Sequence, residues 1–472
     1  MPARKMIAAF TWGKSFSRGR PVGAAEACGD ARLGDRAYRS GLRARARNTA
    51  IMKLALLQGN PVRRRPFPAW PVHGLSEEKR LLRTLRSGKW GRLDGNEVAQ
   101  FEKRFATLHG CKHGIAVVNG SVSLRIALLA AGIRSEDEVI VPPYTFFSTA
   151  SAVVEANAVP VFADIDLQSF NLDPVAVEAA ITRRTRAIIP VHFAGQPADM
   201  QRLMGLARRK NLVVIEDAAH AHGARYRNRP AGSLGDMASF SFQSSKNLTS
   251  GEGGILVTNN DGYAESCRSI QNCGRVADGV WYEHHVISGN YRLGELQGAL
   301  LNCQLARLES QTKRRDRNGV YLSTRLAQFP GVNVQKRPTS CHRHSYHLFM
   351  FRLDDAAFGA PRQAVLQALR AEGIPCSGGY GFSLNLQPMF RNKAFGPYLA
   401  AARPRLNYTA RRCPNSDQVC REAVWLEQSI FLGSRSDMDD IVRAFEKVHE
   451  NRSALSDWFR ESVRTNHPGL LT

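Results

Sequence analysis

The sequence lacks several features that would place it in a common functional class. No apolar run approaches the roughly 18 residues that a membrane-spanning helix needs. The nine cysteines form no CxxC pair and no Cys/His spacing typical of a metal site, so no metal is expected. A disulfide framework is not expected in a chain of 472 residues, and the simplest expectation is therefore a reducing, cytoplasmic location.

Acidic residues are also few, at 41 against 65 lysines and arginines, which gives a formal charge of +24. Basic residues gather at 40–50, 62–70 and 312–318, the last of which is expected on one face of a helix. Such a charge could attract nucleic acid, but no nucleic-acid motif or interleaved aromatic residue accompanies it. We expect neither a nucleic-acid nor a membrane partner, and interpret the charge as a solvated surface and a basic tail. An anionic substrate or cofactor is the second interpretation.

The first 51 residues differ in composition from the rest of the chain. They are rich in Arg, Ala and Gly and show little apolar periodicity, as is typical of a disordered extension. Met52 begins "MKLALLQGNPV", which resembles the start of a folded protein. We expect residues 1–51 to be dispensable, or not to be translated from the natural start.

Hydrophobic periodicity predicts the fold class. Between Gly114 and Asn259 we count seven short apolar runs, bounded by turn residues and in part separated by helical segments such as 197–210. This alternation predicts an α/β domain with a mostly parallel sheet. Helices are expected at 98–110 and at 121–132, the second opened by Ser121.

From about residue 295 the pattern changes to that of a smaller α+β unit. We expect a strand at 345–353 and helices at 293–311, 361–373, 420–430 and 438–450. Gly373 would end the third of these elements, and Ser436 or Asp437 would open the last. The predicted division is a large domain at 52–310 and a small C-terminal domain at 311–472.

A single lysine stands in the segment "FSFQSSKNLTSGEGG", residues 240–254. It cannot belong to a P-loop, because the glycines of that motif precede the lysine and here they follow it. Two interpretations of Lys246 remain. It is a solvated loop charge, or an amine kept for a Schiff base with a carbonyl compound.

Three other signals follow predicted strands, at the sheet edge where open α/β sheets bind ligands. The turn Asn119-Gly120-Ser121 could hold a phosphate, or simply cap a helix. Asp217 ends a buried strand and could face a protonated ring nitrogen, or cap a helix. Phe146 could stack on a flat ring, or pack in the core.

Together these signals predict one ligand: a flat heterocycle with a phosphate arm, a basic ring nitrogen and an aldehyde. That ligand is pyridoxal 5'-phosphate (PLP), which needs a lysine for its Schiff base and an acid at its pyridinium nitrogen. Lys246 supplies the amine and Asp217 supplies the acid.

From Met52 onward the chain resembles the DegT/DnrJ/EryC1/StrS family of PLP-dependent aminotransferases, which have the aspartate aminotransferase type I fold. The resemblance lies in "NGS", "EDEVIVPPYTF", "PVHFAG", "IEDAAHAHG", "FSFQSSKNLTSGEGG" and "GNYRLGELQGA". It implies that Lys246 forms the Schiff base and that Asp217 pairs with the ring nitrogen. It also implies that His220 lies on the side of the ring hydroxyl and that Phe146 stacks on the ring.

The same resemblance implies where the phosphate lies and how the protein assembles. The phosphate would contact Ser121, the backbone of Val122, and Ser241. Asn290 would reach the phosphate from a partner subunit, which implies a homodimer with shared active sites. Dehydratases of the family carry histidine in place of the lysine, so Lys246 favours transamination.

Segments near the C-terminus resemble the branch of the family that acts on keto-cyclitols such as scyllo-inosose, with L-glutamine or L-glutamate as donor. Nucleotide-linked ketosugar aminotransferases and aminohydroxybenzoate synthases are the alternatives, and a non-catalytic PLP sensor is a third. Tyr380 and Trp90 could line the substrate side, or could pack in the core or at an interface.

Overall fold

The computed structural model describes residues 52–410 and 412–465 of the chain. The expected basic extension, residues 1–51, lies outside the described residues. The predictions that it is disordered and dispensable therefore stay predictions.

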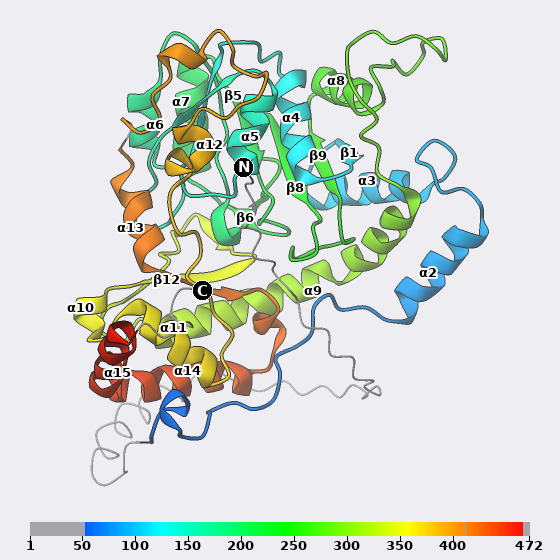
Figure 1. The fold of residues 1–472 in the computed structure, drawn as a ribbon. Helices are drawn as coiled ribbons and strands as arrows, with labels where there is room; N and C mark the ends of the chain where they lie inside the picture. The colour runs from blue at the N-terminus through cyan, green and yellow to red at the C-terminus, as the bar shows by residue number, and fades with distance from the viewer. Residues whose placement is uncertain (1–51, 411, 466–472) are drawn as a thin grey trace, which may run out of the picture. The chain divides into compact units, whose positions relative to one another are not determined.

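The larger part of the fold is built on a seven-stranded sheet, as expected (Figure 1). The strand order is β1-β9-β8-β5-β4-β2-β3, and every neighbouring pair is parallel except the two that involve β9. The seven-stranded, mostly parallel α/β sheet predicted from the sequence is confirmed. Its strands are β1 (His113–Val117), β2 (Glu138–Val141), β3 (Val159–Phe162), β4 (Thr185–Ile188), β5 (Val213–Asp217), β8 (Met237–Ser241) and β9 (Gly254–Thr258).

Helices cover both faces of this sheet, because successive strand residues point to opposite sides. Ile215 packs in one core with α4, α5 and α8, whereas its neighbour Val214 packs in another core with α6 and α7. These two cores fix the sheet between its helical layers. The helices are α3 (Glu97–Leu108), α4 (Gly120–Ala130), α5 (Ser148–Glu155), α6 (Pro174–Ala180), α7 (Met200–Lys210) and α8 (Asp261–Gln271).

One predicted helix start is wrong. Helix α4 begins at Gly120 and its N-cap is Asn119, not Ser121, since the Asn119 side chain accepts a hydrogen bond from the backbone N–H of Val122 at 2.9 Å. Asparagine is as good a cap as serine and stands where the chain is still extended. The Ser121 hydroxyl is thereby left outside the cap.

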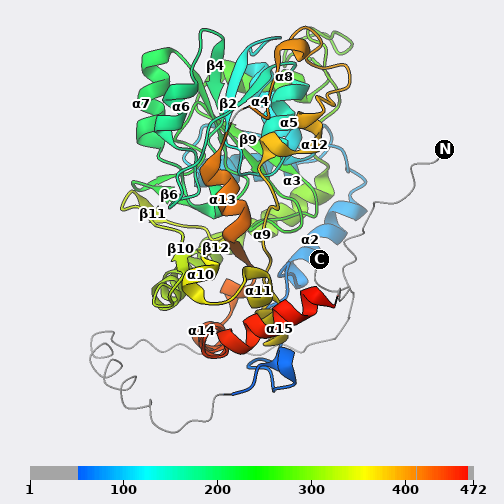
Figure 2. The same cartoon turned by 60° about the vertical axis from the view of Figure 1, so that its left-hand side comes forward.

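The long helix α9 (Glu295–Leu326) leads into the smaller α+β unit that was expected (Figure 2). That unit has a three-stranded sheet in the order β10-β12-β13 and a core of its own, which includes Phe351, Ile441 and Phe445. A division of the chain at residue 310 stays a prediction, and α9 runs through that position. The elements are β10 (Val332–Val334), β12 (Leu348–Leu353), β13 (Ala423–Glu427), α11 (Arg362–Ala371), α14 (Arg435–Glu450) and α15 (Arg452–Arg464).

The helix predicted at 420–430 is wrong. Helix α13 (Pro414–Glu422) ends inside this segment, and residues 423–427 form strand β13, which pairs with β12 along its whole length. Val424 and Leu426 are fully buried against the small core. Val424 and Leu426 point to one face of the strand and Trp425 to the other, as a strand requires. Pairing with β12 therefore overrides the helical spacing seen in the sequence.

Two further expectations at the C-terminal end are corrected. Helix α14 begins at Arg435, and its N-cap is Ser434, which forms a capping box with Asp437; neither Ser436 nor Asp437 is the cap. The basic run 312–318 is helical, as predicted, but it is not wholly solvated. Arg315 within it is fully buried and stacks on the ring of Trp70, with its guanidinium carbon 5.2 Å from the ring centroid.

The remaining elements are short or peripheral, apart from α2, which precedes the sheet. No helix among the described residues is long and apolar enough to cross a membrane. These elements are α2 (Leu75–Arg86), α10 (Asp355–Phe358), α12 (Pro388–Arg391), the strands β6 (Arg225–Tyr226), β7 (Arg229–Pro230) and β11 (Cys341–Arg343), and the 3₁₀ turns η1 (Ala55–Leu57), η2 (Phe193–Gly195), η3 (Leu384–Leu386), η4 (Arg403–Arg405) and η5 (Ile430–Leu432).

Candidate active site

Lys246 lies in the turn that follows β8, at the carboxyl end of the parallel strands. Its backbone N–H donates to the carbonyl of Gln243 at 2.9 Å, which closes the turn. Within residues 52–410 and 412–465, its Nζ has no hydrogen-bond or ion-pair partner. Burial lowers the pKa of the Lys246 amine to about 8, against an opposing effect from the charge of Asp217. A lysine in this state is partly neutral near pH 8 and can act as a nucleophile.

Asp217 is the last residue of β5 and is buried. Its Oδ2 accepts a hydrogen bond from the Thr149 hydroxyl at 2.7 Å, and its Oδ1 accepts one from the backbone N–H of Ala219 at 3.2 Å. Burial raises the pKa of the Asp217 carboxyl, while Thr149, Ala219 and the charge of Lys246 act to lower it. A buried carboxylate of this kind is strongly stabilised by a cation placed beside it.

His220 lies in the turn after β5, three residues beyond Asp217, and is buried. Its Nδ1 is buried without a hydrogen-bond partner among the described residues. Burial, and the charge of Lys246, lower the pKa of the His220 ring well below its usual value, so the ring is neutral. The ring of His347 lies beneath it, with the two centroids 4.2 Å apart. A buried, unpaired ring nitrogen of this kind calls for a polar partner from a ligand.

Three hydroxyl groups gather near the start of α4. The Ser121 and Ser148 hydroxyl oxygens are 2.6 Å apart, although the residues belong to α4 and α5. Ser241, at the end of β8, lies close to the same turn, because a Cβ added at Gly120 would stand 2.8 Å from the Cβ of Ser241. Only glycine at position 120 allows this approach. Hydroxyl groups and a helix N-terminus form a suitable environment for a phosphate.

The backbone N–H of Val122, also predicted to meet the phosphate, already donates to the Asn119 side chain. Its contact with a phosphate stays a prediction. A phosphate seated here would therefore rely chiefly on the hydroxyl groups of Ser121, Ser148 and Ser241.

Two aromatic side chains differ in their surroundings. Phe146 is 52% exposed and packs edge-to-face against Phe147, with ring centroids 4.8 Å apart, so packing in the core does not explain it. Tyr380 is half-buried and packs edge-to-face against Tyr144 and Trp425, with ring centroids 5.4 and 4.9 Å away. Burial and the charge of Asp217 raise the pKa of the Tyr380 phenol.

In the part of the chain that the structure describes, neither Trp90 nor Asn290 makes a hydrogen bond or ring contact with the other predicted site residues. Trp90 is 53% exposed and its indole N–H donates to the carbonyl of Leu85 at 3.0 Å, so core packing is excluded for it. Asn290 is exposed and contacts Asn272 and Arg292. Both positions are available to a second molecule.

The sequence interpretation missed Ser148 and Thr149, which follow the aromatic pair of the "PPYTFF" segment. A signal was present, since two small hydroxyl residues begin a helix that follows a buried strand. Nothing in the local pattern shows that these hydroxyl groups turn toward Ser121 and Asp217, because both partners come from distant parts of the chain.

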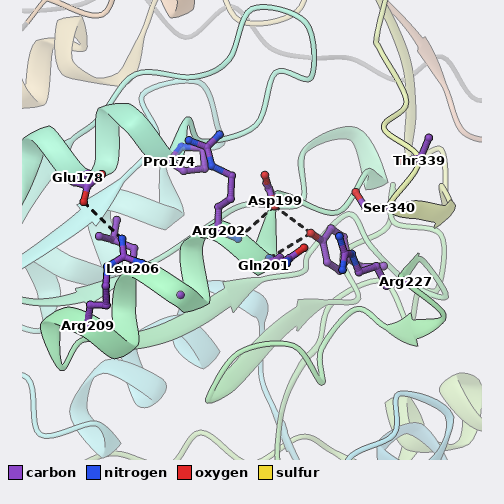
Figure 3. Close-up of a pocket in the computed structure, with 12 residues that line it drawn as sticks. Pro174, Glu178, Asp199, Gln201, Arg202, Leu206, Arg209, Arg227, Thr339 and Ser340 are labelled. Atoms are coloured by element: carbon purple, nitrogen blue, oxygen red, sulfur yellow. Dashed lines mark hydrogen bonds and ion pairs between the residues drawn. The ribbon is translucent and has the colours of Figure 1, made fainter.

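A polar cavity of about 500 Å³ lies elsewhere, beside α6 and α7 (Figure 3). It is lined by none of the predicted site residues; Arg202, Asp199 and Arg227 lie along it, and Arg209 pairs with Glu178 at one end.

Within the described ranges, no three His, Cys, Asp or Glu side chains are grouped so as to hold a metal ion.

Known proteins match this chain over most of its length. The 3-amino-5-hydroxybenzoate synthase of Amycolatopsis mediterranei is 38% identical over 375 residues, which cover 79% of this chain and 94% of the relative. The L-glutamine:2-deoxy-scyllo-inosose aminotransferase of Streptoalloteichus tenebrarius is 37% identical over 432 residues, covering 85% and 99%.

The fold has a close match among solved structures as well. The crystal structure of 3-amino-5-hydroxybenzoic acid synthase superposes with a TM-score of 0.75 at 36% identity, covering 81% of this chain and 99% of that one. The model of the DegT/DnrJ/EryC1/StrS aminotransferase family matches residues 73–446. The protein is thus an aminotransferase, and the chain belongs to the DegT/DnrJ/EryC1/StrS aminotransferase family.

Proposed function

We propose that this aminotransferase binds PLP through Lys246 and moves an amino group from L-glutamine or L-glutamate to a keto-cyclitol. The observation that carries the proposal is that Lys246 and Asp217 follow or end two neighbouring strands, β8 and β5, at the same edge of the sheet. The amine has no hydrogen-bond or ion-pair partner among the described residues, and its pKa of about 8 reflects burial opposed by the charge of Asp217. The amine of a surface lysine would be neither buried nor affected by the charge of a buried carboxylate.

The residues around this pair fit PLP. Asp217 would meet the ring nitrogen, and the unpaired Nδ1 of His220 would meet a polar group at the ring edge. The exposed face of Phe146 would cover the ring. Ser121 and Ser241 would hold the phosphate, as predicted, and Ser148 joins them through its hydrogen bond to Ser121.

When bound, PLP supplies an electron sink that stabilises negative charge at the carbon next to the substrate nitrogen. Asp217 would keep the ring nitrogen protonated, which strengthens that sink. The amine of Lys246 would be the group placed to accept the proton from the substrate carbon that bears the amino group. His220 stays neutral and so adds no positive charge that would compete with the ring proton.

The acceptor is proposed from relatives and not from a contact in the site. Relatives at 36–38% identity are named for L-glutamine and scyllo-inosose derivatives, which favours a cyclitol ketone. A nucleotide-linked ketosugar aminotransferase, or an aminohydroxybenzoate synthase like the first relative, is the alternative. Of the two predicted substrate residues, Tyr380 is favoured, since the charge of Asp217 acts on its phenol.

We also propose a homodimer with shared active sites. Five apolar side chains stand exposed in the segment before Asn290, which favours burial against a second subunit. They are Val280, Trp281, Tyr282, Val286 and Ile287. A cytoplasmic location is the companion proposal, supported by cysteines such as Cys111, Cys267 and Cys341, which form no disulfide among the described residues.

The decisive experiment follows labelled nitrogen. PLP-loaded protein receives L-glutamine carrying ¹⁵N in its α-amino group, together with scyllo-inosose, 2-deoxy-scyllo-inosose or a nucleotide-linked ketosugar. Mass spectrometry should find an aminated cyclitol that carries the label. Amination of the nucleotide-linked sugar alone would move the acceptor to the alternative class.

Two controls sharpen this test. Lys246→Ala should abolish transfer, whereas Lys103→Ala, which changes an exposed lysine on α3, should leave it intact. A protein that binds PLP but performs no half-reaction with glutamine or glutamate would contradict catalysis and favour a PLP sensor.

The shared site has its own test. Lys246→Ala subunits, inactive alone, and Asn290→Ala subunits, weak alone, should regain activity when mixed, because mixed dimers hold one site with both native residues. A protein that stays monomeric in light scattering, or mixtures that regain nothing, would contradict the shared site.

A further inference from the structure

We propose that Thr149, itself held by Thr145, is a positioning residue that fixes the Asp217 carboxylate as an anion aimed at the cofactor's ring nitrogen. This inference rests on the proposed function and deepens it. It assigns a role to two hydroxyl groups that the sequence interpretation did not single out.

The geometry is a chain of two hydrogen bonds that ends on Asp217. The Thr149 hydroxyl donates to Asp217 Oδ2 at 2.7 Å, and the Thr145 and Thr149 hydroxyl oxygens are 3.0 Å apart. Thr145, Thr149 and Asp217 are all buried. Because water does not reach them, these bonds are stronger than the same bonds at a surface.

The direction of the chain follows from hydrogen counting. A hydroxyl group has one hydrogen to donate, and an ionised carboxylate can only accept. Since Thr149 gives its hydrogen to Asp217, it must accept from Thr145. Thr145 thus fixes the rotamer of Thr149, and Thr149 fixes that of Asp217. Bonds accepted at both oxygens, from Thr149 and from the backbone N–H of Ala219, stabilise the charged form of Asp217, so the chain favours the anion.

The two ends of the carboxylate are held by different elements. Thr149, on α5, binds Oδ2, while the backbone N–H of Ala219, in the turn after β5, binds Oδ1. With both oxygens held, the plane of the carboxylate is fixed, and its remaining lone pairs are left for the ring nitrogen. The other titratable groups that act on Asp217 are Lys246, His192 and Tyr380.

The test compares Thr149→Val, which keeps the shape and removes the hydroxyl group, with Thr149→Ser, which keeps the hydroxyl group. Each full-length protein is loaded with PLP labelled with ¹⁵N in the ring. In the native protein the ¹⁵N chemical shift should be that of a protonated ring. In Thr149→Val the equilibrium between a proton on the ring nitrogen and a proton on Asp217 should shift toward Asp217 by a factor of roughly ten to a hundred. This factor corresponds to the free energy of one hydrogen bond to a charged group.

The half-reaction with glutamine should slow by a similar factor, with little change in KM for the donor. Thr149→Ser should restore both readouts, and Thr145→Val should produce a smaller change of the same sign. Thr312→Val is the matched control. It removes another fully buried helical hydroxyl group, which among the described residues donates only to the carbonyl of Leu308, so it should leave the ¹⁵N shift unchanged.

An unchanged ¹⁵N shift in Thr149→Val would overturn the inference, even if the variant melted at a lower temperature, since a purely structural role would affect only stability. A shift that moves equally in Thr312→Val would overturn it too. Native protein that fails to bind PLP would instead defeat the proposed function, so the two failures can be told apart.

Discussion

The proposed Schiff base between Lys246 and PLP has a direct consequence for how the cofactor-free protein would take up PLP. Only the neutral amine attacks an aldehyde, and burial lowers the pKa of this amine from 10.5 to about 8. The rate of PLP uptake should therefore rise with pH and reach half its maximum near pH 8. Stopped-flow absorbance of the cofactor-free protein mixed with PLP measures this midpoint.

The sign of the shift provides a control. Asp217 raises the pKa of Lys246, so Asp217→Asn should move the midpoint for uptake to lower pH. A midpoint near 10.5 in the native protein would mean that Lys246 is an ordinary solvated lysine.

Asp217→Asn also separates cofactor binding from chemistry. The change turns a charge-assisted hydrogen bond into a neutral one, roughly halving its strength. PLP should still bind, through Lys246 and the serine hydroxyl groups, while the half-reaction should slow by about a hundredfold or more, because the lost charge matters most where negative charge develops. Cofactor occupancy and half-reaction rate measure the two effects. Near-normal rates would reduce Asp217 to a structural residue.

The sequence singles out Lys246 because it is the one cation among small and uncharged residues, and Asp217 because it ends a buried apolar run; their roles in the reaction stay predictions. It could not predict Thr149, since a threonine at the start of a helix is common and its partner lies 68 positions away. Burial of Arg315 was unpredictable for a similar reason. Its neighbours Lys313 and Arg314 are exposed, and only helical phase and the packing of Trp70 distinguish it.

At the scale of elements, the segment from η1 to Arg63 is anchored on the C-terminal helices by buried charges. Arg63 donates to Asp437 and Asp440 of α14, both at 2.7 Å. Glu372, fully buried after α11, accepts from the backbone N–H of Ala55 at 2.8 Å and of Val62 at 2.9 Å. This segment is thus part of the small unit's structure, although it comes first in the described chain.

Arg63→Ala should lower the free energy of unfolding by about 3 kcal/mol, because it leaves two buried carboxylates without their buried partner. Arg65 and Arg443 still reach these carboxylates, which limits the loss. Urea denaturation of the cofactor-free protein measures it. The control is Arg64→Ala, next along the chain but exposed and bonded only to Asn60, which should cost less than about 0.5 kcal/mol. Equal effects for the two variants would contradict the anchoring role of Arg63.

Strands of the large sheet were predictable because short β-branched runs between turn residues leave few other choices, as in β5 and β9. The segment 420–430 was not, since its apolar spacing suits a helix as well as a strand, and only pairing with β12 decides between them. Helix starts at Asn119 and Ser434 were misplaced because several capping residues stand close together at each start.

At the scale of the whole molecule, a chain that begins at Met52 should fold and bind PLP as well as the full-length chain does. Among the described residues, Leu54 is the first that belongs to the core of the small unit, and the carbonyl of Met52 accepts a hydrogen bond from the side chain of Asn451. Melting temperature and PLP occupancy of the two proteins should agree.

Removal of residues 1–67 is the contrasting variant. It deletes Leu54 and Arg63 and should therefore yield an unstable protein. If the chain from Met52 were insoluble or free of PLP, the first 51 residues would have a structural role.

The central claim, that Lys246 is the residue that carries PLP, has one direct test. Borohydride reduction of the yellow protein fixes the cofactor on the lysine to which it is bound, and mass spectrometry of the peptides identifies that lysine. The pyridoxyl group should be found on Lys246, in the peptide that contains the Gln243–Gly251 turn, and should be absent from Lys246→Ala. A label on another lysine, or a colourless protein that takes up no label, would contradict the account.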